Sequence, residues 1–119
     1  MMRVARLTSE DEEIEKRGDC FNGTEFIITR RRWLHVLDRH AELAGMTETL
    51  EAAASAPDEV FLDPHGTLHM LRRLSRASDD SVVLIARRRR SKTYLLTAYI
   101  IGAKRKKRRY GRFKKLQLS

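Results

Sequence analysis

The sequence contains one cysteine, two prolines and no long apolar run. Because Cys20 has no partner, an intramolecular disulfide is excluded, and a reducing compartment is expected. Residues 1–16 lack an apolar signal core. The longest apolar-leaning stretch, residues 93–101, is much shorter than the roughly 20 residues that span a bilayer. We therefore expect a cytoplasmic protein that does not use a membrane as its partner.

Several kinds of catalytic site have no support in the sequence. The six glycines are scattered and form no phosphate-binding loop. His65 and His69 straddle the end of a Pro–Gly turn, and no Cys or carboxylate set completes a zinc site. No acid-x-Lys motif follows Pro57 and Asp58, as a restriction-type metal nuclease would require. We expect neither a metal nor a cofactor.

Positive charge is abundant but unevenly distributed. The formal net charge is +9, from 25 Lys and Arg against 16 Asp and Glu. Residues 104–115 hold nine basic residues and no acid, which leaves 16 basic and 16 acidic residues elsewhere. Because such a block repels itself, we expect residues 104–119 to be a disordered basic tail. The acidic residues 1–18 are expected to be a loosely ordered arm, so that residues 19–103 form a single domain.

The basic tail indicates a polyanionic partner. Neutralising phosphates with release of counterions suits RNA or DNA, and Tyr110 and Phe113 offer faces on which bases can stack. The alternatives are a solubility tail and contact with an anionic membrane surface, for which no amphipathic segment supplies a second anchor. The expected nucleic-acid contacts are Arg73, Arg88, Arg89, Lys104, Arg105, Lys106, Lys107, Arg108, Arg109, Arg112, Lys114 and Lys115.

The pattern of apolar residues predicts an α+β fold. We expect two N-terminal helices, over residues 29–43 and 46–56, packed on one side of a small, mainly antiparallel sheet with charged, flexible ends. A basic loop is expected at residues 87–92. The predicted strands cover residues 25–28, 59–62, 68–74, 81–86 and 92–101.

The first predicted helix contains the strongest functional signal. Thr29 is a suitable N-cap, and Gly45 can adopt the left-handed conformation that ends a helix. On a helical wheel, Trp33 and His40 fall on the apolar face. We expect Trp33 to lie in the core, and His40 to be either a core imidazole or a catalytic group.

The polar side of the same helix presents His35 and Arg39 one turn apart, where both can reach one anionic ligand. A solvated helix face is the alternative interpretation. On the last strand, alternation puts Thr97 and Tyr99 on one face, together with Leu95. These side chains permit acid–base chemistry on RNA without a metal. The 2′-hydroxyl is the nucleophile, so the enzyme needs only to move protons and to stabilise charge on phosphorus.

A helix motif W-x-H-h-x-x-R-H-x-E spans residues 33–42, and T-A-Y occupies residues 97–99. With PDEVFLDPHG at 57–66 and SVVLIA at 81–86, these motifs resemble the phage-associated branch of the barnase, EndoU, colicin and RelE-like ribonuclease superfamily. The resemblance covers residues 25–101. It implies a compact α+β fold and metal-independent RNA cleavage in phage-borne or toxin-like settings, in which a protein inhibitor is a possible second partner.

On the matching positions, the resemblance assigns catalytic roles to His35, Arg39, His40, Thr97 and Tyr99. The family often has proline at two positions, where this chain has Ala41 and Ile100. These departures affect the local backbone at the site, and they remove no proton donor.

We therefore expect a ribonuclease in which His35 acts as general base or acid. Arg39 and Arg73 would clamp phosphate, and Thr97 or Tyr99 would complete the site. The rival hypotheses are a non-catalytic RNA- or DNA-binding module and an interaction protein that docks on an acidic partner. The RNA target and the oligomeric state are left open by the sequence.

Overall fold

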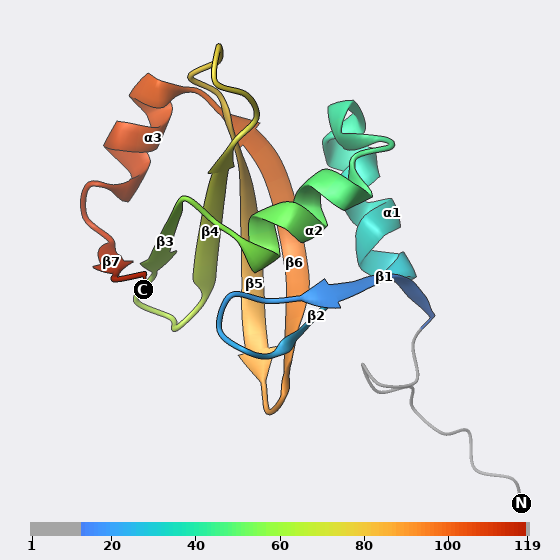
Figure 1. Cartoon of the computed structure of the whole chain (residues 1–119). Helices are drawn as coiled ribbons and strands as arrows, with labels where there is room; N and C mark the ends of the chain where they lie inside the picture. The colour runs from blue at the N-terminus through green and yellow to red at the C-terminus, as the bar shows by residue number, and fades with distance from the viewer. Residues whose placement is uncertain (1–12, 119) are drawn as a thin grey trace, which may run out of the picture.

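A single sheet of seven strands forms the centre of the computed structural model, which describes residues 13–118 (Figure 1). Its strands are β1 (Ile14–Asp19), β2 (Glu25–Thr29), β3 (Glu59–Leu62), β4 (Leu68–Arg73), β5 (Ser81–Arg89), β6 (Lys92–Ile101) and β7 (Lys114–Leu116). Their order in the sheet is β1-β2-β6-β5-β4-β3-β7. Only β2 and β6 pair in parallel, and every other pairing is antiparallel. The predicted α+β fold with a mainly antiparallel sheet is confirmed.

Five strands begin where the apolar pattern predicts them, but the sheet extends further at several points. β5 continues to Arg89, so the predicted basic loop at 87–92 is only a tight turn, in which Arg90 has a φ of 59°. β1 belongs to the sheet and pairs with β2, although it lies largely within the predicted loose arm. The predicted domain boundary at residue 19 is therefore wrong, while residues 1–12 of the arm lie outside the described residues.

Three α-helices accompany the sheet: α1 (Arg30–Arg39), α2 (Thr47–Ser55) and α3 (Ala103–Tyr110). The Thr29 hydroxyl caps α1 as predicted, because it accepts a hydrogen bond from the backbone N–H of Arg32 at 3.3 Å. However, α1 ends at Arg39 and is followed by a 3-10 turn, η1 (Ala41–Leu43), so the predicted helix to residue 43 is too long. The two predicted helices are also not N-terminal, since β1 and β2 precede them. None of the helices in residues 13–118 is long and apolar enough to cross a membrane.

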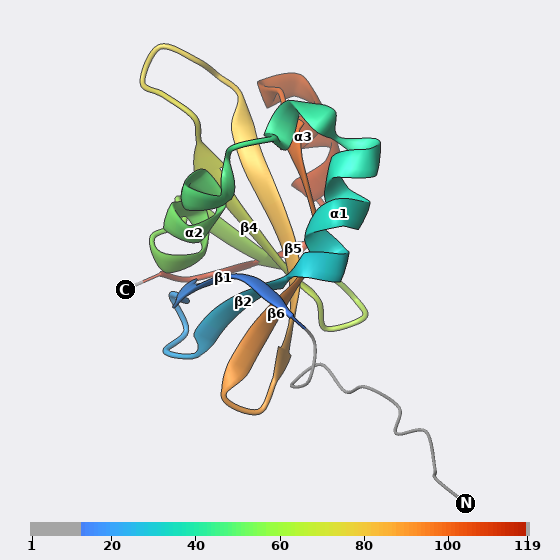
Figure 2. The same ribbon diagram turned by 90° about the vertical axis from the view of Figure 1, so that its right-hand side faces the viewer.

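The helices cover both faces of the sheet, and not one face as predicted (Figure 2). On one face, Trp33 and Val36 of α1 and Leu50 of α2 pack against apolar residues of β2 to β6. On the other face, Tyr110 of α3 packs in a second, smaller cluster. The strand residues of that cluster are Phe61, Leu71, Val83 and Ile101. The third helix escaped prediction because its only core residue lies among basic neighbours.

The basic segment is folded, which contradicts the predicted disordered tail. Tyr110 is 3% exposed and stacks on Phe61, with ring centroids 4.8 Å apart. β7 pairs with β3 and forms an edge of the sheet. The buried position of Tyr110 means that it is not the free base-stacking face that the sequence predicts, and the domain does not end at residue 103.

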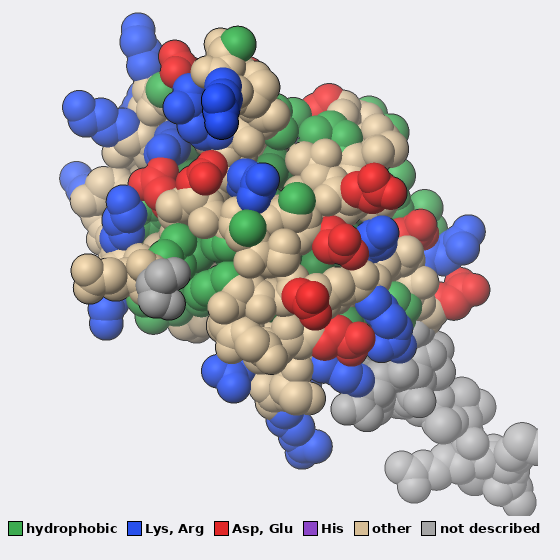
Figure 3. Space-filling view, in the orientation of Figure 1, with side chains coloured by type: hydrophobic (Ala, Val, Ile, Leu, Met, Phe, Trp, Pro, Cys, Tyr) green, Lys and Arg blue, Asp and Glu red, His purple; other side chains and the backbone are tan. Residues whose placement is uncertain are grey.

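Glu59 on β3 connects both parts of this segment to the sheet. Its carboxylate pairs with Lys106 of α3 and, at 3.2 Å, with Lys115 of β7. Burial acts to raise the pKa of Glu59, but the hydrogen bonds from the two lysines outweigh it and lower the pKa. Figure 3 shows many Lys and Arg side chains gathered over α3, whereas acidic and basic side chains are mixed over β1 and α2. The positive surface is therefore attached rigidly to the sheet.

Trp33 provides a test of the core on the α1 side. Its side chain is 6% exposed, as the apolar pattern predicts. Trp33→Ala should lower the free energy of unfolding by about 3–5 kcal/mol, because it leaves a cavity under α1. Urea unfolding followed by circular dichroism measures this loss. The neighbouring Leu34 is 58% exposed, and Leu34→Ala should cost less than about 0.5 kcal/mol. Similar losses in both variants would show that α1 does not pack as described.

Candidate active site

The early end of α1 brings His40 to the second half of β6. The His40 backbone N–H still donates to the Val36 carbonyl at 2.7 Å, but its φ of −136° takes the chain out of the helix. The imidazole lies 6.0 Å from the Tyr99 ring, centroid to centroid. Its Nδ1 is 3.6 Å from a Glu42 carboxylate oxygen, and the side chain is 32% exposed. His40 is therefore not the core imidazole suggested by a continuous helical wheel.

The sheet leaves space for this contact because β2 is short. β2 pairs with β6 only at Lys92–Tyr94, and within the described residues no strand continues along that edge of β6. α1 lies alongside this part of β6 instead (Figure 2). The chain that leaves α1 at His40 consequently passes beside Tyr99.

A β-bulge decides which side chains of β6 belong to the site. Ile85 of β5 pairs with Thr97, whereas the next residue, Ala86, pairs with Leu95, so Leu96 is an extra residue. Leu95 therefore points into the core beneath α1 and α2, while Tyr99 joins the cluster on the α3 face. The sequence predicts Leu95 on the same face as Thr97 and Tyr99. That prediction is wrong because strict alternation does not continue through a bulge.

Behind Tyr99, a chain of hydrogen bonds passes through the α3 face to the β3–β4 turn. The Tyr99 hydroxyl is 3.1 Å from the Tyr110 hydroxyl, which is 2.9 Å from Nδ1 of His69 on β4. Nε2 of His69 is 2.9 Å from Oδ2 of Asp63, in the turn after β3. His69 and Tyr110 are each 3% exposed. These hydrogen bonds thus hold the Tyr99 hydroxyl from the interior of the protein.

The ionised state of Asp63 determines the direction of its hydrogen bond with His69. The other oxygen of Asp63 accepts backbone N–H groups of His65 at 2.8 Å and Thr67 at 3.0 Å. Burial acts to raise the pKa of Asp63, but the hydrogen bonds from His69 and from these amides outweigh it and lower the pKa. A carboxylate can only accept, so the hydrogen on Nε2 belongs to His69. The Tyr110 hydroxyl then bridges Nδ1 of His69 and the Tyr99 hydroxyl.

Tyr110 is held in its neutral form. Burial, and next the hydrogen bond with Tyr99, raise the pKa of Tyr110 far above its ordinary value. The phenol therefore keeps its proton at all working pH values and can act both as donor and as acceptor in the chain.

A permanent positive charge completes the exposed side of this arrangement. The Arg109 guanidinium carbon lies 5.3 Å from the centroid of the Tyr99 ring, within the range of a cation–π contact. His40, Thr97, Tyr99 and Arg109 are called the His40 site below. It combines an imidazole, two hydroxyls and a guanidinium, which are groups that move protons and bind phosphate.

The other predicted catalytic residues lie elsewhere. His35 and Arg39 are on the exposed side of α1, and in residues 13–118 no hydrogen bond, ion pair or ring contact joins them to Thr97 or Tyr99. Arg73 donates to the Ser78 carbonyl at 3.0 Å and thereby holds the loop between β4 and β5. The structure therefore gives Arg73 a structural contact and keeps it away from the His40 site.

The predicted nucleic-acid contacts are divided by the fold. Arg88 donates to the Arg90 carbonyl at 3.1 Å, and strand alternation puts it on the opposite face from Arg89. Lys106 and Lys115 are paired with Glu59. The other predicted contacts lie on the exposed surface of the C-terminal segment, and they are Lys104, Arg105, Lys107, Arg108, Arg109, Arg112 and Lys114.

Asp63, His69 and Tyr110 were not predicted as site residues. His69 is a polar residue within an otherwise apolar strand, which is a signal that a buried polar contact exists. Asp63 and Tyr110 gave no comparable signal, because Asp63 stands in an ordinary turn sequence and Tyr110 stands within the basic block. Only the folded chain joins these three positions.

No protein-family model, curated protein or solved structure matches the chain. Within the described residues, no group of three or more His, Cys, Asp or Glu side chains is arranged to hold a metal ion. The chemistry of the His40 site is therefore the basis for assigning a function.

Asp63 provides a pH test of the buried chain. Its pKa is lowered on folding, so its stabilising effect is complete above the unfolded pKa of about 3.9 and is lost as pH falls through the lower folded value. Asp63→Asn should therefore destabilise the protein most near neutral pH, and the difference from the wild type should shrink below about pH 4. Urea unfolding at a series of pH values measures this difference. Asp38→Asn, at an exposed position of α1, is the control and should show no such trend.

Proposed function

We propose that this protein is a metal-independent endoribonuclease in which His40 is the acid–base group. The observation that carries the proposal is the approach of the His40 imidazole to Tyr99, with Arg109 on the Tyr99 ring. Imidazole is the side chain whose ordinary pKa suits proton transfer near neutral pH. The guanidinium is a permanent cation suited to phosphate.

RNA fits this set of groups because it carries its own nucleophile. The 2′-oxygen forms a bond to phosphorus as the bond to the 5′-oxygen breaks, so one proton must be removed and another supplied. His40 serves as base for the first transfer or, when protonated, as acid for the second. Arg109 stabilises the charge that develops on the phosphate oxygens. The other proton is exchanged with solvent water, and the half-buried Thr97 hydroxyl on the same strand face can relay it, accepting one proton as it gives up another.

Tyr99 is the positioning group in this mechanism. Its hydroxyl is committed to Tyr110, and through it to His69, so its remaining lone pairs have a fixed direction. They can accept a hydrogen bond from a substrate hydroxyl without first being reorganised, and such preorganisation lowers the barrier of the chemical step.

The motif resemblance supports the same residues independently. His40 stands in the helix motif and Tyr99 in the strand motif, and the two meet at ring distance although they are far apart in the chain. A phage-borne or toxin-like setting with an inhibitor protein belongs to this proposal. So does a cytoplasmic location, which agrees with an RNA substrate and with the unpaired, buried Cys20.

A non-catalytic RNA- or DNA-binding module is the second candidate, and the basic surface of α3 favours it. The helix contains no acid, and its exposed residues carry only positive charge apart from Ala103. This surface binds phosphates whether or not the His40 site cleaves them. Cleavage therefore distinguishes the two candidates.

The catalytic proposal is tested with purified protein and single-stranded RNA in the presence of a chelator. Cleavage should proceed and leave 2′,3′-cyclic phosphate and 5′-hydroxyl ends, and DNA should survive because it lacks the 2′-hydroxyl. His40→Ala should reduce the rate about 10²–10⁴-fold, as expected for a positioned acid or base. Its melting temperature should change little, because the side chain is partly exposed.

His35→Ala is the matched comparison, since it removes the other histidine of the same motif from the exposed side of α1. It should keep its activity if His40 is the acid–base group. Loss of activity in His35→Ala with full activity in His40→Ala would move the acid–base role to the exposed face of α1. Cleavage that stops with chelator, or no cleavage at all, would reject the proposed mechanism.

Binding to α3 is tested by removing charge without removing the helix. Deleting residues 104–119 is unsuitable because Tyr110 is part of the core. The combined substitution Lys104→Gln, Arg105→Gln, Lys107→Gln and Arg108→Gln should reduce the slope of log affinity against log salt by up to about 3 for single-stranded RNA. Filter binding at several salt concentrations measures the slope. An unchanged slope would show that this side of α3 does not contact phosphates.

A further inference from the structure

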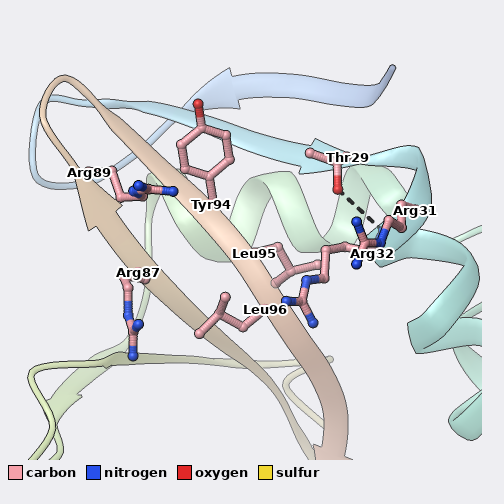
Figure 4. Close-up of a pocket in the computed structure, with 8 residues that line it drawn as sticks. All are labelled: Thr29, Arg31, Arg32, Arg87, Arg89, Tyr94, Leu95 and Leu96. Carbon is pink, nitrogen blue, oxygen red and sulfur yellow. Dashed lines mark hydrogen bonds between the residues drawn. The ribbon is translucent and has the colours of Figure 1, made fainter. Parts of the chain in front are cut away.

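A second concentration of arginines lies at the opposite end of the sheet from α3. It forms a pocket of about 450 Å³ between the start of α1, the end of β5 and the first half of β6 (Figure 4). The pocket is lined by Thr29, Arg31, Arg32, Arg87, Arg89, Tyr94, Leu95 and Leu96. We call it the arginine pocket. Of the lining residues, only Leu95 belongs to an apolar cluster. Packing of the core therefore does not account for the presence of arginines here.

The register of the strands brings the four arginines together. Arg87 and Arg89 are two residues apart on β5 and so extend from the same face. β2 is parallel to β6 and pairs with it up to Tyr94, which places the start of α1 beside the middle of β6. Figure 4 shows Arg87 and Arg89 on one side of β6 and Arg31 and Arg32 on the other, with Leu95 and Leu96 between the two pairs.

The charges in the pocket favour an anion. None of its lining residues is acidic. Among residues 13–118, the guanidinium groups of Arg32 and Arg87 have no hydrogen-bond or ion-pair partner. A bound phosphate would satisfy the planar guanidinium forks of Arg32 and Arg87. Leu96, which is half-buried, adds apolar surface of the kind that a sugar or base contacts.

The arginine pocket and the His40 site lie on one continuous face of the sheet. On β5, alternation puts Val83, Ile85, Arg87 and Arg89 on that face. Val83 pairs with Tyr99, Ile85 with Thr97, and Arg87 with Tyr94. α3 covers the Val83 end, where Tyr110 packs. The pocket lies toward the opposite end of this face, around Arg87 and Arg89.

The spacing between the two places suits a stacked single strand of RNA. Val83 and Arg87 are four residues apart, which is about 13 Å along β5 at about 3.3 Å per residue. That distance spans about four nucleotides of a stacked strand at about 3.4 Å each. A dinucleotide bound at the His40 site is therefore too short to reach the arginines.

We propose that the arginine pocket is a phosphate-binding subsite for a single-stranded RNA segment that runs along this sheet face from the His40 site. The proposal rests on the ribonuclease function, which supplies RNA as the ligand. The protein then selects oligonucleotides over dinucleotides, because only the longer ligand gains the arginine contacts. The pocket also fixes which flank of the cleaved bond is bound, since it lies to one side of His40.

Binding is measured separately from cleavage with a fluorescent decanucleotide made entirely of 2′-O-methyl RNA, which has no nucleophile. Arg87→Ala should weaken its binding about tenfold, or about 1.4 kcal/mol, because it removes a charge-assisted hydrogen bond to phosphate. The salt slope should fall by about 0.7. Binding of the matching dinucleotide should not change. Arg32→Ala, on the other wall of the pocket, should reproduce this pattern, and both variants should keep the wild-type melting temperature because both side chains are exposed.

Arg76→Ala is the charge-matched control. Arg76 is exposed in the loop before β5, at the opposite end of that strand from Arg87 and Arg89. Arg76→Ala removes the same charge as Arg87→Ala, so it shows how much affinity is lost through long-range electrostatic attraction alone. Its affinity for the decanucleotide should stay within about twofold of the wild type.

The outcomes separate this subsite from the ribonuclease proposal. If the wild type cleaves RNA, and Arg87→Ala lowers kcat/KM for an unmodified decanucleotide but not for an unmodified dinucleotide, both proposals are supported. If the wild type cleaves neither RNA but Arg87→Ala still weakens decanucleotide binding, the subsite stands and the nuclease fails. Equal affinities of Arg87→Ala and the wild type would overturn the subsite. A poly-glutamate peptide that binds more tightly than RNA, and loses affinity in Arg87→Ala, would overturn RNA as its ligand.

Discussion

The packing of Tyr110 against His69 is the contact on which the rest of the structure depends. Without it, the basic segment 104–115 would depend on the Glu59 ion pairs and the β3–β7 pairing to stay on the sheet. The Tyr110 ring stacks on Phe61, and its hydroxyl joins His69 to Tyr99, so one side chain supplies both apolar burial and a satisfied polar contact. Glu59 then forms ion pairs with two neighbouring lysines. α3 is therefore a rigid basic surface, and Arg109 has a defined position over Tyr99.

Two local interruptions of regular structure make the His40 site. If α1 continued to residue 43, His40 would remain on the apolar side of a helix. If β6 alternated without a bulge, Leu95 would share a face with Tyr99, and the inner core would lose a buried leucine. The helix end and the bulge each cost some regular hydrogen bonding. In return, they redirect a histidine and a tyrosine toward each other, which is a common reason for irregularities next to functional sites.

The same sheet face accounts for binding and for chemistry in the proposed function. Buried hydrogen bonds hold the Tyr99 end, and the arginine end is open to solvent. A strand of RNA lying between them would exchange its counterions for guanidinium groups at one end while its backbone is positioned for proton transfer at the other. This division agrees with the lining of the arginine pocket, which includes no acidic residue.

The sequence by itself determined the local elements. Periodicity located α2, the start of α1 and five of the strands, and Trp33 was correctly assigned to the core, because a half-buried element leaves its period in the chain. It also identified His40, Thr97 and Tyr99 as chemically capable. Only the tertiary structure decided that His40 and Tyr99 meet, that α1 stops at Arg39, and that the basic segment folds. These outcomes depend on contacts between residues distant in the chain, such as Tyr110 with His69, whose energy exceeds the weak local preference of the segments concerned.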